Sequence, residues 1–315
     1  MKDDMFARIC GAMYGVAVGD ALGAPLEFMD APSIEKKHGT VREMIGGGWL
    51  NVKPGEVTDD TQMTLCVARG IVESPEAPVE AVGRQFILWQ ESRPRDIGGI
   101  IRSSITIANI LGGRNPSEDD WQIAAHKTHI QHNGLSAGNG SLMRTAYVGL
   151  YYPDLWDVIS FADDLSTMTH YDPIAAEACA AYSVTIYRMI NEGEFQKRRE
   201  RLHPAIQYVA NSKYDFVLDK HYSPNPSGYV VDSLAAALHC IYTTETFEDA
   251  VVKAVNLGGD ADTIGAITGG LAGAMYGFEA IPERWVACLS PDVSAEIGRL
   301  SDDAATNRKS ANLWQ

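Results

Sequence analysis

Apolar residues recur every three or four positions through most of the chain, which is the period of an amphipathic α-helix. The first such run spans Phe6 to Leu22 and places these apolar residues on one face: Phe6, Ile9, Met13, Val16 and Ala17. Further runs with this period predict helices over 61–73, 78–91, 98–111, 154–168, 173–191, 229–243, 246–257 and 262–277. Alternating strand patterns are nearly absent, and Val41 to Ile45 is too short to define a sheet. The pattern therefore predicts an all-α protein.

Two stretches within the expected helices, residues 11–24 and 264–277, are rich in glycine and alanine. Glycine inside a helix costs about 1 kcal/mol relative to alanine, so these glycines indicate two helices that approach each other closely. We see no internal repeat, low-complexity tract or long linker that would divide the chain. We therefore expect one compact helical domain over residues 1–315.

Composition narrows the classes of partner. Hydrophobic residues make up 45% of the 315 positions, enough for a large core, and the net charge of −15 argues against nucleic-acid or anionic-membrane surfaces. A phosphate-bearing small molecule stays allowed, because a helix N-terminus or a cation can hold it. The five cysteines lie far apart, as buried free thiols of a reducing compartment do. Without a signal peptide or a run of about 20 apolar residues, we expect a cytoplasmic protein with no transmembrane segment.

Two acidic stretches near opposite ends of the chain each contain glycine and each open an expected helix: Gly55 to Thr61 and Gly258 to Gly265. Either one alone is most simply a helix N-terminus, where acidic caps are favourable. Together they supply oxygen donors suited to Mg²⁺, Mn²⁺ or Ca²⁺ rather than zinc. The donors of the first stretch lie in Thr58-Asp59-Asp60-Thr61, and those of the second are Asp260, Asp262 and Thr263. We expect folding to bring them around two divalent cations, with Glu27 as a further carboxylate.

Three other patterns match catalytic motifs without their structural context. The Asp260-x-Asp262 spacing occurs in aspartyl-phosphate phosphatases, which need a parallel strand where this chain has a helical run. Residues 134–138 match the serine-hydrolase elbow Gly-x-Ser-x-Gly, but no core strand precedes them. Three histidines are spaced three apart: His126, His129 and His132. On a helix they would spread over roughly 120°, too wide for one zinc site, so we expect them on a solvated helix face.

A glycine-containing turn before another apolar helix offers backbone N–H groups that could cradle a diphosphate. Its residues are Asn139, Gly140, Ser141, Leu142, Met143 and Arg144, the last of which we expect to brace the turn. Many helices begin with Gly-Ser, so this signal is weak alone. Tyr229 is either a platform for stacking a base or an ordinary core aromatic. His170 is, by default, a structural histidine with its hydrogen bonds satisfied.

Taken in order, these motifs resemble the ADP-ribosylglycohydrolases over nearly the full length of the chain. The matching segments are Gly19–Gly23 with Glu27, Thr58–Thr61, Gly138–Gly140 with Met143 and Arg144, Thr169–His170, and Gly258–Thr263. The resemblance implies an all-α orthogonal helical domain with a binuclear Mg²⁺ or Mn²⁺ centre in a cleft. It also implies hydrolysis of the N-glycosidic bond between ADP-ribose and an arginine side chain of a modified protein.

The resemblance assigns roles by position. The metal ligands would be Thr58, Asp59, Asp60, Asp260, Asp262 and Thr263. Asp96 and Glu27 would be the catalytic carboxylates, one of them handling proton transfer. The substrate contacts would come from Asn139, Gly140, Ser141 and Met143 around the diphosphate, His170 in the cleft and Tyr229 on the adenine.

Within the family, three stretches look most like the bacterial members that act on ADP-ribosylated dinitrogenase reductase: Met44–Leu50, Ser92–Gly98 and Tyr229–Asp232. Where those enzymes usually have Asp-x-Gly-Asn-Thr, this chain has Asp96-Ile97-Gly98-Gly99-Ile100. Loss of that Asn removes a polar group near the ribose and leaves the acceptor open. The implied partners are an ADP-ribosylated protein, the ADP-ribose product and a PII-type regulator.

Two alternatives to arginine de-ADP-ribosylation stay open. The protein could release ADP-ribose from another acceptor, such as a toxin-modified target or a serine side chain. It could instead bind ADP-ribosylated proteins without turnover, as an immunity protein would. The six candidate ligands are all present, which favours an enzyme.

Overall fold

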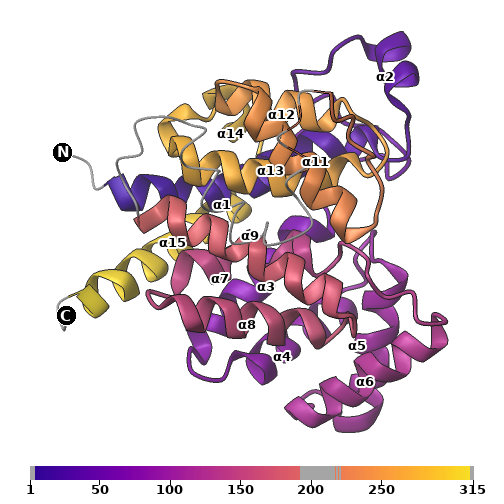
Figure 1. Cartoon of the computed structure of the whole chain (residues 1–315), viewed down its shortest axis with the longest axis vertical. Coiled ribbons are helices and arrows are strands. Elements are labelled where there is room, and N and C mark those ends of the chain that lie inside the picture. Colours follow the sequence, from indigo (N-terminus) through magenta and orange to yellow (C-terminus); the bar gives the residue numbers. More distant parts are fainter. Residues whose placement is uncertain (1–3, 192–216, 218, 220, 313–315) are drawn as a thin grey trace.

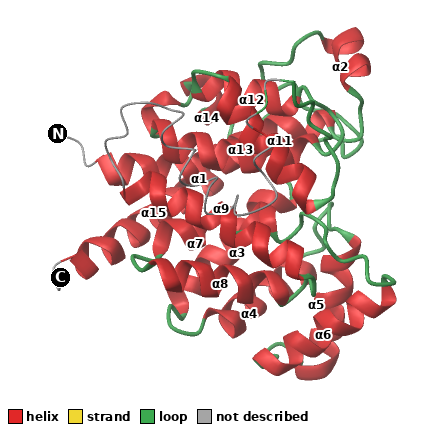
Figure 2. Ribbon diagram, viewed as in Figure 1, coloured by secondary structure: helices red, strands yellow, loops and turns green. Residues whose placement is uncertain are grey.

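The computed structural model describes residues 4–191, 217, 219 and 221–312. Within these ranges the regular secondary structure is helical, with isolated bridges such as that between Gly47 and Val52 but no β-strand (Figure 2). The short Val41–Ile45 segment is not a strand. The prediction of an all-α protein is confirmed.

In chain order the helices are α1 (Asp4–Gly23), η1 (Ala24–Leu26), α2 (Ala31–His38), α3 (Asp59–Glu73), α4 (Pro78–Glu91), α5 (Gly99–Gly112), α6 (Glu118–Gln131), η2 (Leu142–Arg144), α7 (Ala146–Tyr151), α8 (Leu155–Thr167), α9 (Pro173–Asn191), α11 (Val230–Thr243), α12 (Phe247–Val255), α13 (Ala261–Tyr276), η4 (Phe278–Ala280), α14 (Glu283–Val286) and α15 (Pro291–Asn312). Each predicted run coincides with one of these helices, with ends that agree to within two residues. The predicted runs do not cover α2, α6, α7, α14 or α15.

Helices α1 and α13 cross the centre of the fold side by side (Figure 1). Their glycines face each other so closely that a Cβ on Gly15 would lie 2.0 Å from the carbonyl oxygen of Gly269. A Cβ on Gly19 would meet the Gly265 carbonyl oxygen at the same distance. The predicted close approach of the two glycine-rich helices is therefore confirmed. It brings the C-terminal end of α1 next to the first turn of α13, where Asp262 lies.

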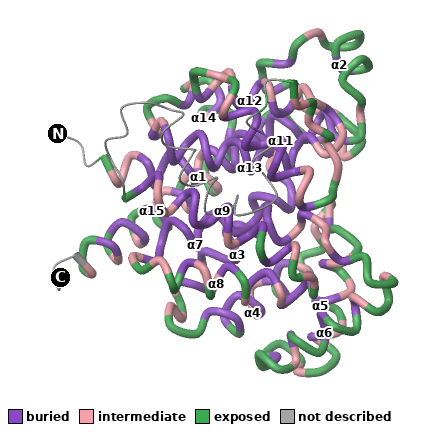
Figure 3. Tube along the Cα trace, in the orientation of Figure 1, coloured by how far each residue is buried: buried purple, intermediate pink, exposed green. Residues whose placement is uncertain are grey.

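One large cluster of buried apolar side chains draws on helices from α1 to α15. Figure 3 shows this burial concentrated around α1, α13, α9, α7 and α3, whereas α2 and parts of α5 and α6 are exposed. A single domain over residues 1–315 stays a prediction.

Four of the five free cysteines are buried as expected, but Cys288 is exposed. The expectation of five buried thiols was wrong at that position.

One stretch among the described residues, Asp4–Leu26, is long and apolar enough to cross a membrane by length and composition. No such run was expected from the sequence. In the structure 94% of the most apolar 18-residue part of this stretch is buried inside the protein, as in a core helix.

Candidate metal-binding cleft

Asp20 on α1 fixes the N-terminal acidic turn. Its carboxylate is fully buried and accepts hydrogen bonds from the Thr58 hydroxyl at 2.8 Å, the Thr58 N–H and the Thr61 N–H at 3.1 Å. Thr58 makes no side-chain cap bond to α3, so the neighbouring helix supplies the acceptor for these donors. Burial raises the pKa of Asp20 to about 6, against the lowering effect of the two threonines. The turn that carries Asp59 and Asp60 is thereby held against α1.

The two acidic stretches meet inside the molecule. The Thr263 hydroxyl donates to Oδ2 of Asp60 at 3.4 Å, across 203 positions of sequence. The Thr58 hydroxyl lies 3.3 Å from the same oxygen. Oδ1 of Asp60 is buried and has no hydrogen-bond partner among the described residues. An unpaired carboxylate oxygen in the interior is unfavourable unless a cation compensates it.

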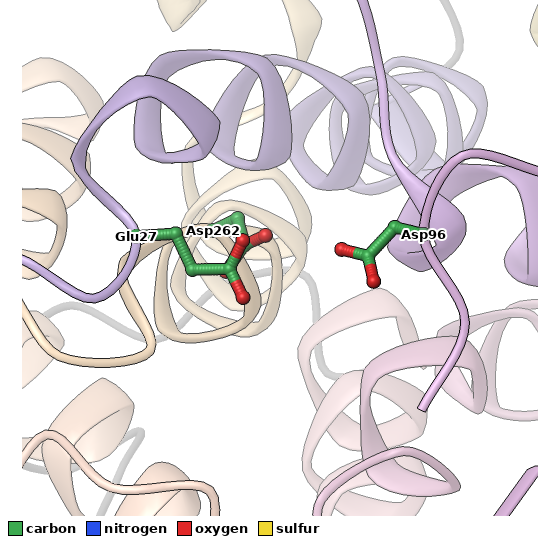
Figure 4. Close-up of side chains that lie close together, drawn as sticks. All are labelled: Glu27, Asp96 and Asp262. Atoms are coloured by element: carbon green, nitrogen blue, oxygen red, sulfur yellow. The ribbon is translucent and has the colours of Figure 1, made fainter. Parts of the chain in front are cut away.

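Glu27, Asp96 and Asp262 come from three separate elements and face a common space (Figure 4). Glu27 follows η1, Asp96 lies in the loop before α5, and Asp262 is in the first turn of α13. One carboxylate oxygen from each lies within 4.8 Å of the other two. Asp96, predicted as a catalytic carboxylate, therefore joins the same carboxylate cluster as the predicted ligand Asp262.

The cluster is strongly acidic and poorly solvated. Burial raises the pKa of Asp59, Asp60 and Asp262 well above the ordinary range, and repulsion from neighbouring carboxylates adds to it. Burial likewise raises the pKa of Asp96, and that of Glu27 to about 7. Among the ion pairs of the described residues, none joins a Lys or Arg to these groups. Hard oxygen donors, the orphaned Asp60 oxygen and uncompensated negative charge together fit divalent cations of the Mg²⁺ or Mn²⁺ type.

The loop predicted to bind diphosphate borders the same cavity. Asn139, a residue of this loop, contacts the C-terminal acidic stretch directly. Its side-chain amide donates to Asp260 Oδ2 at 2.8 Å and to the Ser233 hydroxyl at 2.9 Å. The cavity measures about 250 Å³, and its walls include Gly138, Asn139, Gly140, Met143, His170, Asp260 and Asp262. The Ser141 side chain is buried and accepts a hydrogen bond from Ser166 at 2.9 Å, so its hydroxyl does not line the cavity.

His170 and Arg144 are linked through Thr169 and pack against the loop predicted to bind diphosphate. Nδ1 of His170 lies 2.8 Å from the Thr169 hydroxyl, which also accepts a hydrogen bond from Arg144 Nη2 at 2.7 Å. Burial, helped by the Arg144 charge, lowers the pKa of His170 to about 3, so the imidazole is neutral. The Arg144 guanidinium stacks over Phe86 at 4.5 Å. The structure thus places Arg144 as the expected brace, and His170 both satisfies its hydrogen bond and lines the cavity.

Tyr229 and Thr58 stand at the edges of the site. Tyr229 is 42% exposed, forms an isolated bridge with Gly138 and does not line the cavity. Thr58 is buried at the start of α3 and bonds Asp20. Asp20, which holds the turn carrying Asp59 and Asp60, is a site residue to which the sequence motifs assigned no role of its own. The available signal was an acidic residue inside a buried glycine-alanine helix.

The remaining motifs have structural explanations. Ser136 is buried in the loop after α6, with no strand before it, and its hydroxyl lies 2.6 Å from His129 Nδ1. The helix α6 carries His126 on its exposed surface, but His129 is half-buried against Tyr171. His132, at the C-terminal cap of α6, is half-buried as well. The expectation of a solvated histidine face was therefore wrong for His129 and His132.

Comparison with known proteins agrees with this architecture. A family model described as ADP-ribosylglycohydrolase matches residues 1–312. The chain is 35% identical over 298 residues to ADP-ribosyl-[dinitrogen reductase] glycohydrolase of Rhodospirillum rubrum, with 94% of each covered. It is 29% identical to ADP-ribosylarginine hydrolase Tri1 of Serratia proteamaculans (strain 568), with 88% of this chain and 73% of Tri1 covered.

A solved structure titled "ADP-ribosylglycohydrolase-related protein complex" superposes with a TM-score of 0.79 at 30% identity. The superposition covers 98% of this chain and 100% of the chain of the solved structure. The protein belongs to the ADP-ribosylglycohydrolase family.

Proposed function

We propose that the protein hydrolyses the N-glycosidic bond joining ADP-ribose to an arginine side chain of a modified protein. The main support is the meeting of Asp60 and Thr263 beside an unpartnered Asp60 oxygen. Membership of the ADP-ribosylglycohydrolase family supports release of ADP-ribose as the reaction. The names of the Rhodospirillum and Serratia relatives favour a protein acceptor and, for Tri1, arginine.

Two divalent cations, Mg²⁺ or Mn²⁺, would be held by the six predicted ligands: Thr58, Asp59, Asp60, Asp260, Asp262 and Thr263. When bound, such cations lower the pKa of a water molecule and fix the orientation of ribose hydroxyls. The donor chemistry of the cluster supports this choice, because these side chains offer oxygen ligands alone.

The chain's own carboxylates would handle the proton. Asp96 and Glu27 extend into one space from separate loops, so a glycosidic bond between them can receive a proton on its leaving nitrogen (Figure 4). Most of the rate would come from positioning and electrostatics, because the cleft offers no evident covalent nucleophile.

The diphosphate would lie over the backbone of Gly138 to Ser141, above the neutral imidazole of His170. The Tyr229 ring is exposed beside this loop and would stack on the adenine. Buried Ser141 can contribute its backbone N–H but not its hydroxyl to such a site.

The biological setting is also part of the proposal. The substrate would be an ADP-ribosylated cytoplasmic protein, with dinitrogenase reductase as the candidate that the Rhodospirillum relative names. ADP-ribose would be the product, and a PII-type protein would regulate access.

A second candidate keeps the chemistry and changes the acceptor. Gly99 lies in the cleft wall where the family resemblance expects Asn, and the name of the 24% identical mouse relative, ADP-ribosylhydrolase ARH3, specifies no acceptor. A panel of arginine-, serine- and phosphate-linked ADP-ribose, each assayed with Mg²⁺ and with Mn²⁺, separates the two. Release from the arginine conjugate alone supports the proposal, and release from serine alone supports the second candidate. Binding of ADP-ribose without release from any conjugate would reject both.

A further inference from the structure

Two exposed aromatic side chains lie on the rim of the cleft. Phe28 is 70% exposed and Trp49 is 52% exposed, and their ring centroids are 5.4 Å apart. Phe28 lines the cavity next to Glu27. Exposed apolar groups that gather beside a candidate active site point to a role in that site.

Phe28 adopts a backbone conformation that bulky residues rarely take. Its φ angle is +63°, in the left-handed region that favours glycine. The Phe28 N–H donates to the Gly259 carbonyl at 2.7 Å, and the Gly259 N–H donates to the Met29 carbonyl at 2.7 Å. This exchange ties the segment after Glu27 to the turn that carries Asp260. Strain of this kind persists where the surrounding structure fixes it, commonly at functional sites.

Trp49 is presented by a tight loop that packs on the other side of Glu27. Gly47 and Val52 exchange backbone hydrogen bonds of 2.7 and 2.9 Å, which close the loop. Gly48 has φ +68°, and a Cβ there would lie 2.8 Å from the Cα of Pro25. The loop tip therefore sits directly against the residues before Glu27. From this tip the Trp49 indole N–H donates to Oε2 of Glu27.

We propose that Trp49 is a positioning residue for Glu27. Its indole N–H holds one carboxylate oxygen so that the group faces Asp96 and Asp262, and Phe28 braces the indole ring. The inference rests on the proposed function, in which Glu27 is a catalytic candidate. A free glutamate has three rotatable side-chain bonds, so loss of this contact lets the carboxylate leave the cluster.

The test is a double-mutant cycle on release of ADP-ribose from ADP-ribosyl-arginine at saturating metal. Trp49→Phe keeps a ring against Phe28 and removes the N–H donor. We expect kcat to fall about 10- to 100-fold with KM nearly unchanged, because a positioned hydrogen bond to a charged group is lost. In a Glu27→Ala background the same change should add no further loss, since Trp49 then has nothing to position. Trp156→Phe, on an exposed residue of α8, is the matched control and should keep full activity.

The proposal is overturned if Trp49→Phe retains the wild-type kcat, or if it slows the Glu27→Ala protein by the same factor as the wild type. A measurement without turnover separates this outcome from failure of the proposed function. The indole proton signal of Trp49, identified by its loss in Trp49→Phe, should move upfield in Glu27→Ala. If wild-type protein releases no ADP-ribose, the proposed function fails. The indole signal still decides whether Trp49 holds Glu27, and an unmoved signal rejects the contact.

Discussion

Asn139 donates its side-chain amide to Asp260 at 2.8 Å and so joins the predicted diphosphate loop to the C-terminal acidic stretch. The amide also contacts the Ser233 hydroxyl at 2.9 Å, and Asn139 is buried. The orientation of Asp260 toward the cluster thus depends on a residue of the substrate loop. The predicted substrate contacts and the predicted metal ligands are therefore joined by a direct hydrogen bond at this point.

This hydrogen bond predicts that Asn139→Ala lowers both the catalytic efficiency and the affinity for Mn²⁺. Loss of a buried hydrogen bond to a charged group costs about 1.5–3 kcal/mol, so kcat/KM should fall about 10- to 100-fold. The affinity for Mn²⁺ should fall as well, because Asp260 loses its fixed orientation. Steady-state kinetics and calorimetric titration measure the two effects. Asn109→Ala, on the side of α5, is the control, and an unchanged Mn²⁺ affinity in Asn139→Ala would break the proposed link.

The glycine contact between α1 and α13 predicts opposite effects of the same substitution at two helical positions. Gly15→Ala places a Cβ 2.0 Å from the Gly269 carbonyl oxygen, so the helices must separate. We expect a loss of about 3 kcal/mol in the free energy of unfolding. Gly298→Ala on α15 meets no atom within 4 Å and should gain up to about 1 kcal/mol from helix propensity. Urea denaturation compares them, and equal effects would contradict the close approach.

The buried neutral His170 predicts a pH dependence of stability. Its folded-state pKa is lowered to about 3, against about 6.5 in the unfolded chain. Below pH 6.5 the unfolded state therefore binds a proton that the folded state excludes, and this term removes stability until the pH reaches the folded pKa. Between pH 7.5 and 5 the loss should be about 2 kcal/mol.

The measurement is the difference in denaturation free energy between wild type and His170→Asn at those two pH values. The variant lacks the titrating group, so its stability should fall less by about that amount. His38→Asn removes an exposed histidine of α2 and should keep the wild-type slope. Parallel pH profiles for wild type and His170→Asn would show that His170 is not held neutral.

Gly99 predicts that the family amide can be restored without harm to the fold. A Cβ at Gly99 would meet only His132 Cε1, at 3.8 Å, which is ordinary contact. Gly99→Asn should therefore fold with at least wild-type stability and should raise kcat/KM on arginine-linked ADP-ribose several-fold through a new polar contact. The same panel of conjugates measures the change. A drop on every conjugate would mean that the cleft wall excludes a side chain at this position.

Periodicity in the sequence was sufficient for most helices, because their buried faces carry large apolar residues at regular spacing. The apolar period did not predict helix α15, because the buried face of that helix includes Ser301 and Arg308 beside Ile297 and Leu300. Arg308 is buried only because carbonyl groups at the end of α7 accept its N–H donors. Such a partner is a tertiary contact and leaves no local pattern.

The residues of the candidate site also fall into those visible as local motifs and those defined only by tertiary contacts. The two acidic stretches were visible as local motifs, so their residues were predicted. Asp20 and Trp49 make hydrogen bonds to segments at least 22 positions away, and no local pattern could assign a role to either of them. The side-chain direction of Ser141 was also beyond the motif, because it depends on Ser166 and Cys179 packing beneath the loop.

Acidic residues from both ends of the chain are proposed to share one pair of cations. Calorimetric titration of metal-free protein with Mn²⁺ counts these ions. We expect two ions per wild-type chain, and a loss of at least one in both Asp60→Asn and Asp262→Asn, one residue from each stretch. Wild-type protein that binds no Mn²⁺, or variants that keep both ions with unchanged affinity, would contradict it.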